Sequence, residues 1–398
     1  MGHICYVIGS LDIGGTERHL SQIAIAMKRR GWTVTIACLT HKGTLAPEVE
    51  SAGVEVLSSR IGPTGNRLGI IKRAVRMISE AGRLARTLAV RRPDIAHFFL
   101  PDAYVLGGIL AVVAGVSIRI MSRRSLNLYQ SRRPVARFVE GRLHNRMTAV
   151  LINAMPQLHD LVTIEGCQPQ RVGLIYNGVD TTRFRPASDR TKLREALKLD
   201  TNAFIMICVA NLIPYKGHAD LFEALARITT QLPRAWRLLC VGRRENYGVE
   251  LESLAESLGI SAQIDFLGEC ADVSFLLQTA DIGILPSHEE GMSNVILEAM
   301  ATALPMIATN VGGNAEAIVN AESGIIVPPR NISMLAEAIL FLARDAQSRV
   351  RLGKAGRERA VAHFGLEHCA DLYDTLYAQL MEGKPISDLG EFIPRLRQ

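Results

Sequence analysis

Residues 282–301 read IGILPSHEEGMSNVILEAMA, an apolar segment, a polar loop and a second apolar segment in close succession. Ile282–Pro286 has the length and composition of a fully buried strand, whereas Asn294–Ala301 is typical of a helix. A strand followed at once by a loop and a helix is the repeating unit of a parallel sheet with helices on both faces. The segment therefore predicts an α/β fold.

The same unit recurs on both sides of this segment. We expect further strands at Phe204–Val209, Trp236–Val241, Ile264–Leu267, Pro305–Ala308 and Ile325–Val327, and helices at His218–Gln231, Gly248–Leu258 and Val273–Thr279. This alternation is typical of one doubly wound, Rossmann-like domain.

The first half of the chain shows the same rhythm. Strands are expected at His3–Ile8, Thr33–Leu39, Ile95–Phe99 and Ile118–Ser122, and helices at Glu17–Arg30, Leu68–Val90 and Tyr104–Ala114. Because 398 residues exceed the roughly 250–300 at which a single core stops growing, two domains are expected. We place the two domains at residues 1–185 and 186–365, with a polar linker at Asp180–Asp200. Residues 366–398 are expected to form a helix, Leu366–Met381, that crosses back over the domain junction, followed by a tail.

Composition narrows the class of protein. Hydrophobic residues make up 48% of the chain and charged residues 21%, which suits packed globular domains. The seven cysteines form no C-x-x-C pair and predict reduced thiols without a metal site. The start lacks a basic signal-peptide region, and the longest apolar run, Ala103–Ile118, is shorter than the about 20 residues that span a bilayer. We therefore expect a cytoplasmic location.

Acidic and polar side chains follow the strand at Ile282–Pro286. In parallel α/β sheets, ligands bind beyond the carboxyl ends of the strands. Glu290 lies on this loop, Ser293 and Asn294 are suited to cap the following helix, and the backbone N–H groups of its first turn would bind an anion. Glu298 lies four residues after Asn294, on the same helix face. Two carboxylates could thus bind sugar and ribose hydroxyls, with a diphosphate between them.

The pair Glu290 and Glu298, in an E-x7-E arrangement with Gly291 and the sequence EAMA at 298–301, resembles the retaining glycosyltransferases of family 4. The resemblance implies a GT-B fold, in which two Rossmann-like domains face each other across a cleft. It implies an acceptor-binding domain at 1–185 and a nucleotide-sugar-binding domain at 186–365. It also implies a sugar transfer from a nucleotide-diphosphate-sugar with retention of configuration.

Lys216 lies in the segment VANLIPYKGH, residues 209–218, which is similar to the diphosphate-binding segment of that family. The resemblance implies that Lys216 offsets the charge of the leaving diphosphate and that Glu290 orients the donor sugar. Relatives often carry Arg where Asn211 stands, so the second cation is unassigned, and Arg243 is a candidate. The expected catalytic residues are Lys216 and Glu290, and the expected donor-binding residues are Gly15, Asn211, Arg243, Gly291, Met292, Ser293, Asn294, Val295 and Glu298.

Other turns are less specific. The segment LDIGGTE, residues 11–17, is similar to the family's G-G-x-E turn and includes Gly15, but it is not the G-x-G-x-x-G of an NAD site. NGVD at 177–180 is typical of a structural hinge. VGGNAE at 311–316 matches a family turn that would lie near the donor, although a plain loop explains it equally well.

Acceptor contacts are expected in the first domain. Many relatives carry a His after the fourth strand, where this chain has MSRRSLN at 121–127. His97 could point into the cleft or be a satisfied structural histidine, and Arg123 and Arg124 are candidates for contact with acceptor or phosphate charge. The acceptor implied by the resemblance is a glycan or a lipid-linked molecule.

Charge is unevenly distributed. Residues 1–180 carry 23 Lys and Arg against 12 Asp and Glu, whereas residues 181–398 carry 22 against 27. The segment Arg67–Arg92 interleaves eight basic residues with apolar ones, which suits either peripheral contact with the anionic inner face of the plasma membrane or a solvated helix. Because no aromatic residues accompany these charges, nucleic acid is not an expected partner.

No D-x-D pair occurs, so the carboxylate clamp on a divalent metal is missing, and we expect neither a metal nor another cofactor. Two alternatives to a glycosyltransferase remain. A nucleotide-sugar epimerase or hydrolase on the same fold would act without an acceptor, and a catalytically silent protein would only bind the sugar nucleotide. The presence of Glu290, Glu298 and Lys216 disfavours the silent protein.

Overall fold

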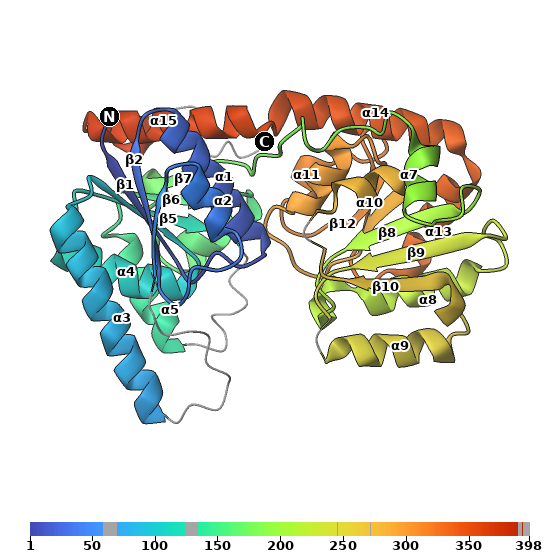
Figure 1. The fold of residues 1–398 in the computed structure, drawn as a ribbon, viewed down its shortest axis with the longest axis horizontal. Coiled ribbons are helices and arrows are strands. Elements are labelled where there is room, and N and C mark those ends of the chain that lie inside the picture. Colours follow the sequence, from blue (N-terminus) through green and yellow to red (C-terminus); the bar gives the residue numbers. More distant parts are fainter. Residues whose placement is uncertain (59–69, 125–133, 245, 271, 389–391, 393–398) are drawn as a thin grey trace. The chain divides into compact units, whose positions relative to one another are not determined.

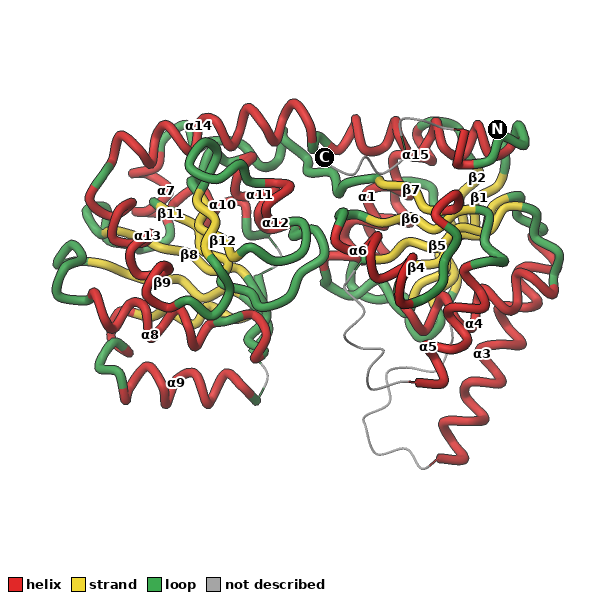
Figure 2. Tube along the Cα trace, turned by 180° about the vertical axis from the view of Figure 1, so that it is seen from behind, coloured by secondary structure: helices red, strands yellow, loops and turns green. Residues whose placement is uncertain are grey.

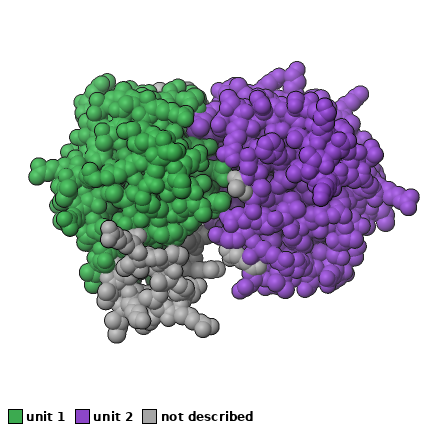
Figure 3. All heavy atoms as spheres, in the orientation of Figure 1, with its two compact units in different colours: residues 1–177, 367–398 green, residues 178–366 purple. Residues whose placement is uncertain are grey.

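A computed structural model describes residues 1–58, 70–124, 134–244, 246–270, 272–388 and 392. The chain divides into two compact units (Figure 3). Unit 1 comprises Met1–Asn177 and Glu367–Gln398, and unit 2 comprises Gly178–Leu366. The chain therefore first passes from unit 1 to unit 2 earlier in the sequence than the expected boundary at 185/186. Phe184, which lies inside the expected first domain, is buried in unit 2.

Unit 1 contains a parallel sheet that, within the described residues, has seven strands in the order β3-β2-β1-β4-β5-β6-β7. The strands are β1 (His3–Ile8), β2 (Thr33–Cys38), β3 (Glu55–Leu57), β4 (Ile95–Phe99), β5 (Ile118–Arg123), β6 (Ala149–Ile152) and β7 (Val172–Leu174). The order reverses between β1 and β4, which makes this pair the topological switch point of the sheet.

Helices cover both faces of this sheet. They are α1 (Gly15–Arg29), α2 (Ala46–Ser51), α3 (Ile70–Arg91), α4 (Pro101–Val113), α5 (Pro134–His144), α6 (Pro156–His159) and α15 (Leu366–Met381). Figure 1 shows α3, α4 and α5 together on one face. Side chains of β1 alternate between the faces. Cys5 and Val7 belong to the core on the α3–α5 side, whereas Tyr6 contacts α15 on the other.

The helix α15 is an integral part of unit 1 although it follows unit 2 in the chain. The Trp32 indole N–H donates to Asp374 (2.6 Å), Arg30 pairs with Asp371 (2.6 Å), and the hydroxyls of Tyr6 and Tyr377 lie 3.2 Å apart. The expected return of residues 366–381 is therefore observed, with α15 buried against β1 and α1 residues of the first unit.

Unit 2 contains a second parallel sheet, whose strands β8, β9, β11 and β12 are labelled in Figure 2. Among its described residues the sheet has six strands, in the order β10-β9-β8-β11-β12-β13. These are β8 (Phe204–Val209), β9 (Trp236–Val241), β10 (Ile264–Gly268), β11 (Ile282–Leu285), β12 (Met306–Thr309) and β13 (Ile325–Val327). All six match expected strands to within about a residue at either end. The order reverses between β8 and β11.

The helices of unit 2 are α7 (Arg190–Ala196), α8 (His218–Ile228), α9 (Tyr247–Ser257), α10 (Ser274–Thr279), α11 (Asn294–Ala301), α12 (Asn314–Ala317), α13 (Ile332–Arg344) and α14 (Ala346–His363). Apolar residues of α8, α9 and α13 pack against one face of the sheet in a single core. Two parallel-sheet domains of this kind confirm the predicted α/β fold.

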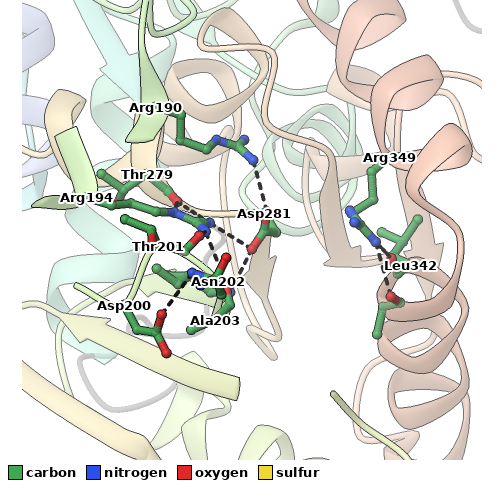
Figure 4. Close-up of polar contacts among 12 residues, drawn as sticks. Arg190, Arg194, Asp200, Thr201, Asn202, Ala203, Thr279, Asp281, Leu342 and Arg349 are labelled. Carbon is green, nitrogen blue, oxygen red and sulfur yellow. Dashed lines mark hydrogen bonds and ion pairs between the residues drawn. The ribbon is translucent and has the colours of Figure 1, made fainter. Parts of the chain in front are cut away.

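The expected linker at 180–200 is instead folded into unit 2. Figure 4 shows the side chain of Arg194, from α7, pointing toward Asp281. Its buried guanidinium donates to the carbonyls of Thr279 (2.8 Å) and Ala203 (3.1 Å) and to the Asp281 carboxylate (2.9 Å). The polar composition that suggested a linker therefore reflects an internal hydrogen-bond network.

None of the helices in the described ranges combines the length and the apolar character that a bilayer-spanning segment requires. The start of the expected helix at Leu68–Val90 lies outside the described residues, as do Arg67 and Ser125–Asn127.

Candidate functional site

The candidate site of unit 2 lies at the carboxyl ends of β8 and β11, where the strand order reverses. A crevice forms at such a point because the loops after the two strands lead to opposite faces of the sheet. Lys216 lies on the loop after β8, and Glu290 lies on the loop after β11. The two residues with expected catalytic roles are therefore brought together, although 74 positions separate them in sequence.

Lys216 and Glu290 form an ion pair. The Lys216 Nζ atom donates to Glu290 Oε1 at 2.7 Å, and the Ser287 hydroxyl donates to the same oxygen at 2.7 Å. The side chains are only 18% and 11% exposed. Burial alone would lower the pKa of Lys216, but the charge and hydrogen bond of Glu290 outweigh it and raise that pKa above its usual 10.5. The ion pair thus favours the charged form of the Lys216 ammonium group.

The loops that carry this pair touch through their backbones. Gly217 adopts a left-handed conformation (φ +74°), and a Cβ atom there would lie 2.0 Å from the carbonyl oxygen of Pro286. Only glycine allows such an approach. The backbone N–H of His288 also donates to the carbonyl of Tyr215 at 2.7 Å.

A third loop, after β12, packs against Glu290. Gly312 has φ +51°, and a Cβ atom there would lie 2.1 Å from the carbonyl oxygen of Glu290. The N–H of Gly313 donates to the carbonyl of Gly291 at 2.6 Å. The turn at 311–316 thus contacts the glutamate loop directly.

The helix α11 begins beside this pair. Ser293 occupies the N-cap position with extended backbone angles, but its side chain makes no capping hydrogen bond. The expected hydroxyl cap is therefore not formed. The Ser293 hydroxyl accepts no capping hydrogen bond from the N–H groups of the first turn, where Asn294 and Val295 lie. Met292 and Gly291 are buried, and Glu298 is 9% exposed one turn into the helix.

Asn211 and Arg243 also lie together. The Asn211 side-chain oxygen accepts a hydrogen bond from the backbone N–H of Arg243 at 3.0 Å, which ties the loop after β8 to the loop after β9. Asn211 thus makes a structural contact between these two loops. Arg243 is exposed at the same edge of the sheet.

The candidate residues of unit 1 are placed differently. Gly15 is exposed at the first position of α1. His97 is fully buried, with Nδ1 2.8 Å from the Tyr377 hydroxyl and Nε2 2.8 Å from the Ser122 hydroxyl. Burial, reinforced by the charge of Arg124, lowers its pKa well below 6.5. Of its two expected roles, the structure supports the satisfied structural histidine.

Arg123 is buried rather than presented to a ligand. Its guanidinium pairs with Glu165 and lies 3.6 Å from Glu140, and His144 Nε2 lies 2.8 Å from Glu165. Ligand atoms of Glu140, His144 and Glu165 lie within 4.8 Å of one another, a spacing that could suit a metal ion. Because the Arg123 guanidinium already lies against both carboxylates, we assign the group to a buried ionic network. The expected contact of Arg123 with acceptor charge is corrected accordingly.

Arg124 is half-buried at the end of β5. It donates to the side-chain oxygen of Asn177 and, at 2.9 Å, to the Tyr373 hydroxyl of α15. Its guanidinium also lies 5.3 Å from the ring centroid of Phe99. Arg124 thus joins the segment that leaves unit 1 to the helix that returns to it.

Sequence reasoning missed several residues of these networks. Ser287 and His288 lie next to the predicted glutamate but have no role in the sequence prediction, and neither do Tyr373 and Tyr377. Polar side chains immediately beside a predicted strand end are the signal that could have found the first two. Tyr377 contacts His97 from 280 positions away and Tyr373 contacts Arg124 from 249, which no local pattern reports.

Two family models match the chain. A model described as Glycosyltransferase Family 4 matches residues 13–183, and one described as Glycosyl transferases group 1 matches residues 189–359. Together the two matches cover most of the chain, and β1 and α15 lie outside them.

Curated relatives span nearly the whole chain. The D-inositol 3-phosphate glycosyltransferase of Rhodococcus erythropolis is 28% identical over 91% of this chain and 86% of its own length. The protein of the same name from Streptomyces bingchenggensis is 27% identical over 94% and 87%.

Solved structures share the fold. HepE of Anabaena, in complex with UDP and glucose, has a TM-score of 0.83 at 22% identity and covers 95% of this chain and all of its own. The sucrose-phosphate synthase of Thermosynechococcus elongatus has a TM-score of 0.80 at 22% identity, covering 96% of this chain and all of its own. These likenesses identify the fold as GT-B.

Proposed function

Because the chain belongs to the family 4 glycosyltransferases, we propose that it moves a sugar from a nucleotide-diphosphate donor to an acceptor hydroxyl with retention of configuration. The observation that carries the proposal is the Lys216–Glu290 pair at the switch point between β8 and β11, beside the start of α11. A lysine, a helix N-terminus and two acidic side chains supply contacts for a diphosphate and for sugar hydroxyls.

The donor is proposed to lie across this edge of unit 2. Glu290 orients the donor sugar, Glu298 accepts hydrogen bonds from ribose hydroxyls, and Lys216 offsets the diphosphate charge. The N–H groups between Gly291 and Val295 complete the anion site. The solved structures of HepE with UDP and with UDP-glucose support a nucleotide-sugar donor.

The proposed chemistry is a substitution at the anomeric carbon. The bond from this carbon to the diphosphate oxygen breaks, and a bond to the acceptor oxygen forms on the same face of the sugar. The acceptor proton passes to the leaving diphosphate. Lys216 stabilises the charge that develops on this leaving group, a role that a divalent metal fills in other transferases. We therefore propose a metal-independent reaction.

We also propose peripheral contact with an anionic membrane, through the outer surface of α3, α4 and α5. Apolar side chains exposed there are Ile78 (72%), Val90 (69%), Ile109 (43%), Val113 (80%), Val135 (76%) and Phe138 (62%). Arg86, Arg92, Arg137 and Arg142 are exposed on or directly after these helices. Arg83 and Arg91 of α3 instead pair with Glu80 and Glu55. The exposed cations of α5 lie outside the basic segment that the sequence of α3 indicated. Apolar and basic side chains together suit a lipid surface. A glycan or lipid-linked acceptor in polysaccharide or lipid-linked glycan synthesis fits this placement.

The function is tested by a donor screen. Purified protein is incubated with UDP-, GDP- and ADP-sugars, with and without an acceptor panel that includes inositol phosphates, and transfer is separated from hydrolysis and epimerisation by product analysis. We expect transfer with one donor class, and in Lys216→Ala a loss of turnover of about a hundredfold or more.

Lys354→Ala is the matched control, because Lys354 lies exposed on α14 and pairs with Glu358 at 3.8 Å. Its turnover should equal that of the wild type. Hydrolysis or epimerisation without transfer would favour the enzymatic alternative, and donor binding without any turnover would favour a silent binding protein.

A further inference from the structure

His288 contacts the lysine loop at two points. Its backbone N–H donates to the carbonyl of Tyr215 at 2.7 Å, and its side-chain Nε2 lies 2.8 Å from Asp220 Oδ2. Tyr215 and Asp220 stand on either side of Lys216, and His288 lies two residues before Glu290. One residue therefore holds the segment around Lys216 from both sides.

The side-chain contact is partly shielded from water. The side chains of His288 and Asp220 are 19% and 20% exposed, so their interaction is screened less than that of a pair on the open surface. Asp220 lies in the first turn of α8, where the helix dipole favours a carboxylate. The pair thus joins the glutamate loop to a rigid element rather than to another loop.

The Lys216–Glu290 pair has a second task that conflicts with holding the loops together. In the function proposed above, the ammonium group of Lys216 contacts a diphosphate and Glu290 contacts sugar hydroxyls. These ligands compete for the same atoms that form the ion pair. A contact that joins the two loops without using either charge would keep them in register while the donor binds.

We propose that His288 and Asp220 are positioning residues that hold Lys216 and Glu290 at their working separation when the donor is bound. The inference rests on the proposed function, because it assigns a role to residues around the same site. It assigns His288 no contact with the donor, so its effect passes entirely through the loop that carries Lys216.

Donor binding in full-length variants tests this role. The probe is whichever of UDP-, GDP- and ADP-glucose the wild type binds most tightly by titration calorimetry. H288A keeps the backbone hydrogen bond and loses only the side-chain contact. We expect it to weaken donor binding by about tenfold, within the usual range of coupling between contacting residues. H288Q should recover most of this loss, because the glutamine amide nitrogen can donate to Asp220 from a similar reach.

A double-mutant cycle separates positioning from a general loss of stability. If His288 acts through Lys216, H288A should cause little further loss of binding in the K216A background. D265N is the matched control, because it removes the Arg237–Asp265 pair of the same unit near the amino ends of β9 and β10. It should lower the unfolding temperature without weakening donor binding.

The outcomes are distinct. A wild type that binds none of the three nucleotide sugars overturns the proposed function and this inference with it. A wild type that binds, together with H288A that binds equally well, overturns the inference alone. So does an equal loss in the wild-type and K216A backgrounds, or a failure of H288Q to recover binding.

Discussion

Lys216 is held between its burial and its partner. Burial disfavours the charged form of Lys216, whereas Glu290, 2.7 Å away, favours it. The effect of Glu290 is the larger one, so the pKa of Lys216 is raised. A lysine can offset the charge of a diphosphate only in its protonated form, and Glu290 stabilises that form. The same logic explains His97, where burial prevails and the pKa falls well below 6.5.

This balance predicts a pH dependence for the Glu290→Gln variant. In the wild type the folded-state pKa of Lys216 exceeds the unfolded value, so the pair contributes stability that is fully present below the unfolded pKa and is lost as the pH rises through the folded pKa. In the variant, burial is opposed only by the smaller effects of Tyr215 and Cys208, so the pKa of Lys216 falls and the destabilisation is relieved as the pH rises. The difference in unfolding free energy between the two proteins should therefore shrink as the pH rises.

Denaturant unfolding between about pH 7 and pH 11 measures this difference. Donor binding gives a second readout, since the variant should lose affinity at a lower pH than the wild type does. A difference in stability that stays constant up to the alkaline end would show that Glu290 does not set the charge of Lys216.

Residues of the unit 2 site were predictable because they follow strands. Lys216 and Glu290 each stand a few positions after an apolar strand, and a parallel sheet brings such positions to one edge. Arg123 ends β5 and His97 is the middle residue of β4, yet their partners Glu165 and Tyr377 come from elements distant in sequence. Burial of a polar side chain against a distant partner leaves no mark in the local pattern.

At the level of elements, prediction succeeded for the strands of unit 2 and was incomplete in unit 1. The six strands of unit 2 were all expected, whereas β3, β6 and β7 of unit 1 were not. Length alone does not explain the difference, because β13 (Ile325–Val327) is as short as β7 (Val172–Leu174). The sequence analysis missed the helix α7 because its charged residues favour a solvated linker. Arg194 is instead buried and makes five internal hydrogen bonds.

The outer surface of α3, α4 and α5 carries the prediction about membranes. Val135 and Phe138 project from α5, and the guanidinium of Arg142 lies 4.6 Å from the ring centroid of Phe138. The double variant Val135→Ser, Phe138→Ser should bind vesicles that contain phosphatidylglycerol at least about tenfold more weakly, because it removes apolar area from the contact. Vesicle sedimentation measures the change.

The control for this experiment is Val350→Ser, Val361→Ser on α14 of unit 2, where the two valines are 72% and 49% exposed. That variant should bind as the wild type does. Equal sedimentation of the wild type with phosphatidylglycerol vesicles and with pure phosphatidylcholine vesicles would remove the proposed membrane contact.

For the molecule as a whole, the two units differ in how the chain builds them. Unit 2 is a single continuous segment, closed where Val179 exchanges backbone hydrogen bonds with Phe364 (2.8 Å) and Leu366 (2.9 Å). Unit 1 needs two segments, because α15 buries Tyr373 and Tyr377 against its sheet. The units should therefore differ in their ability to fold alone.

Residues 178–366 expressed alone are expected to unfold cooperatively and to bind the same nucleotide as the full chain. Residues 1–177 alone, without α15, are expected to lack a cooperative transition, since Tyr6 and His97 lose their contacts with Tyr377 and become exposed. Calorimetric melting and nucleotide titration of both fragments test this. A cooperative transition of the 1–177 fragment at the temperature of the full-length protein would contradict it.

The split construction of unit 1 has a consequence for its biosynthesis. Its sheet is translated first, yet the helix that seals that sheet emerges from the ribosome only after all of unit 2 has been made. Unit 2 can therefore reach its native state during translation. Residues 1–177 of unit 1 meanwhile keep exposed the apolar surface that α15 later covers. The nascent chain is most exposed to chaperones and proteases in the part of unit 1 that precedes unit 2, and this part is completed only when α15 docks on it.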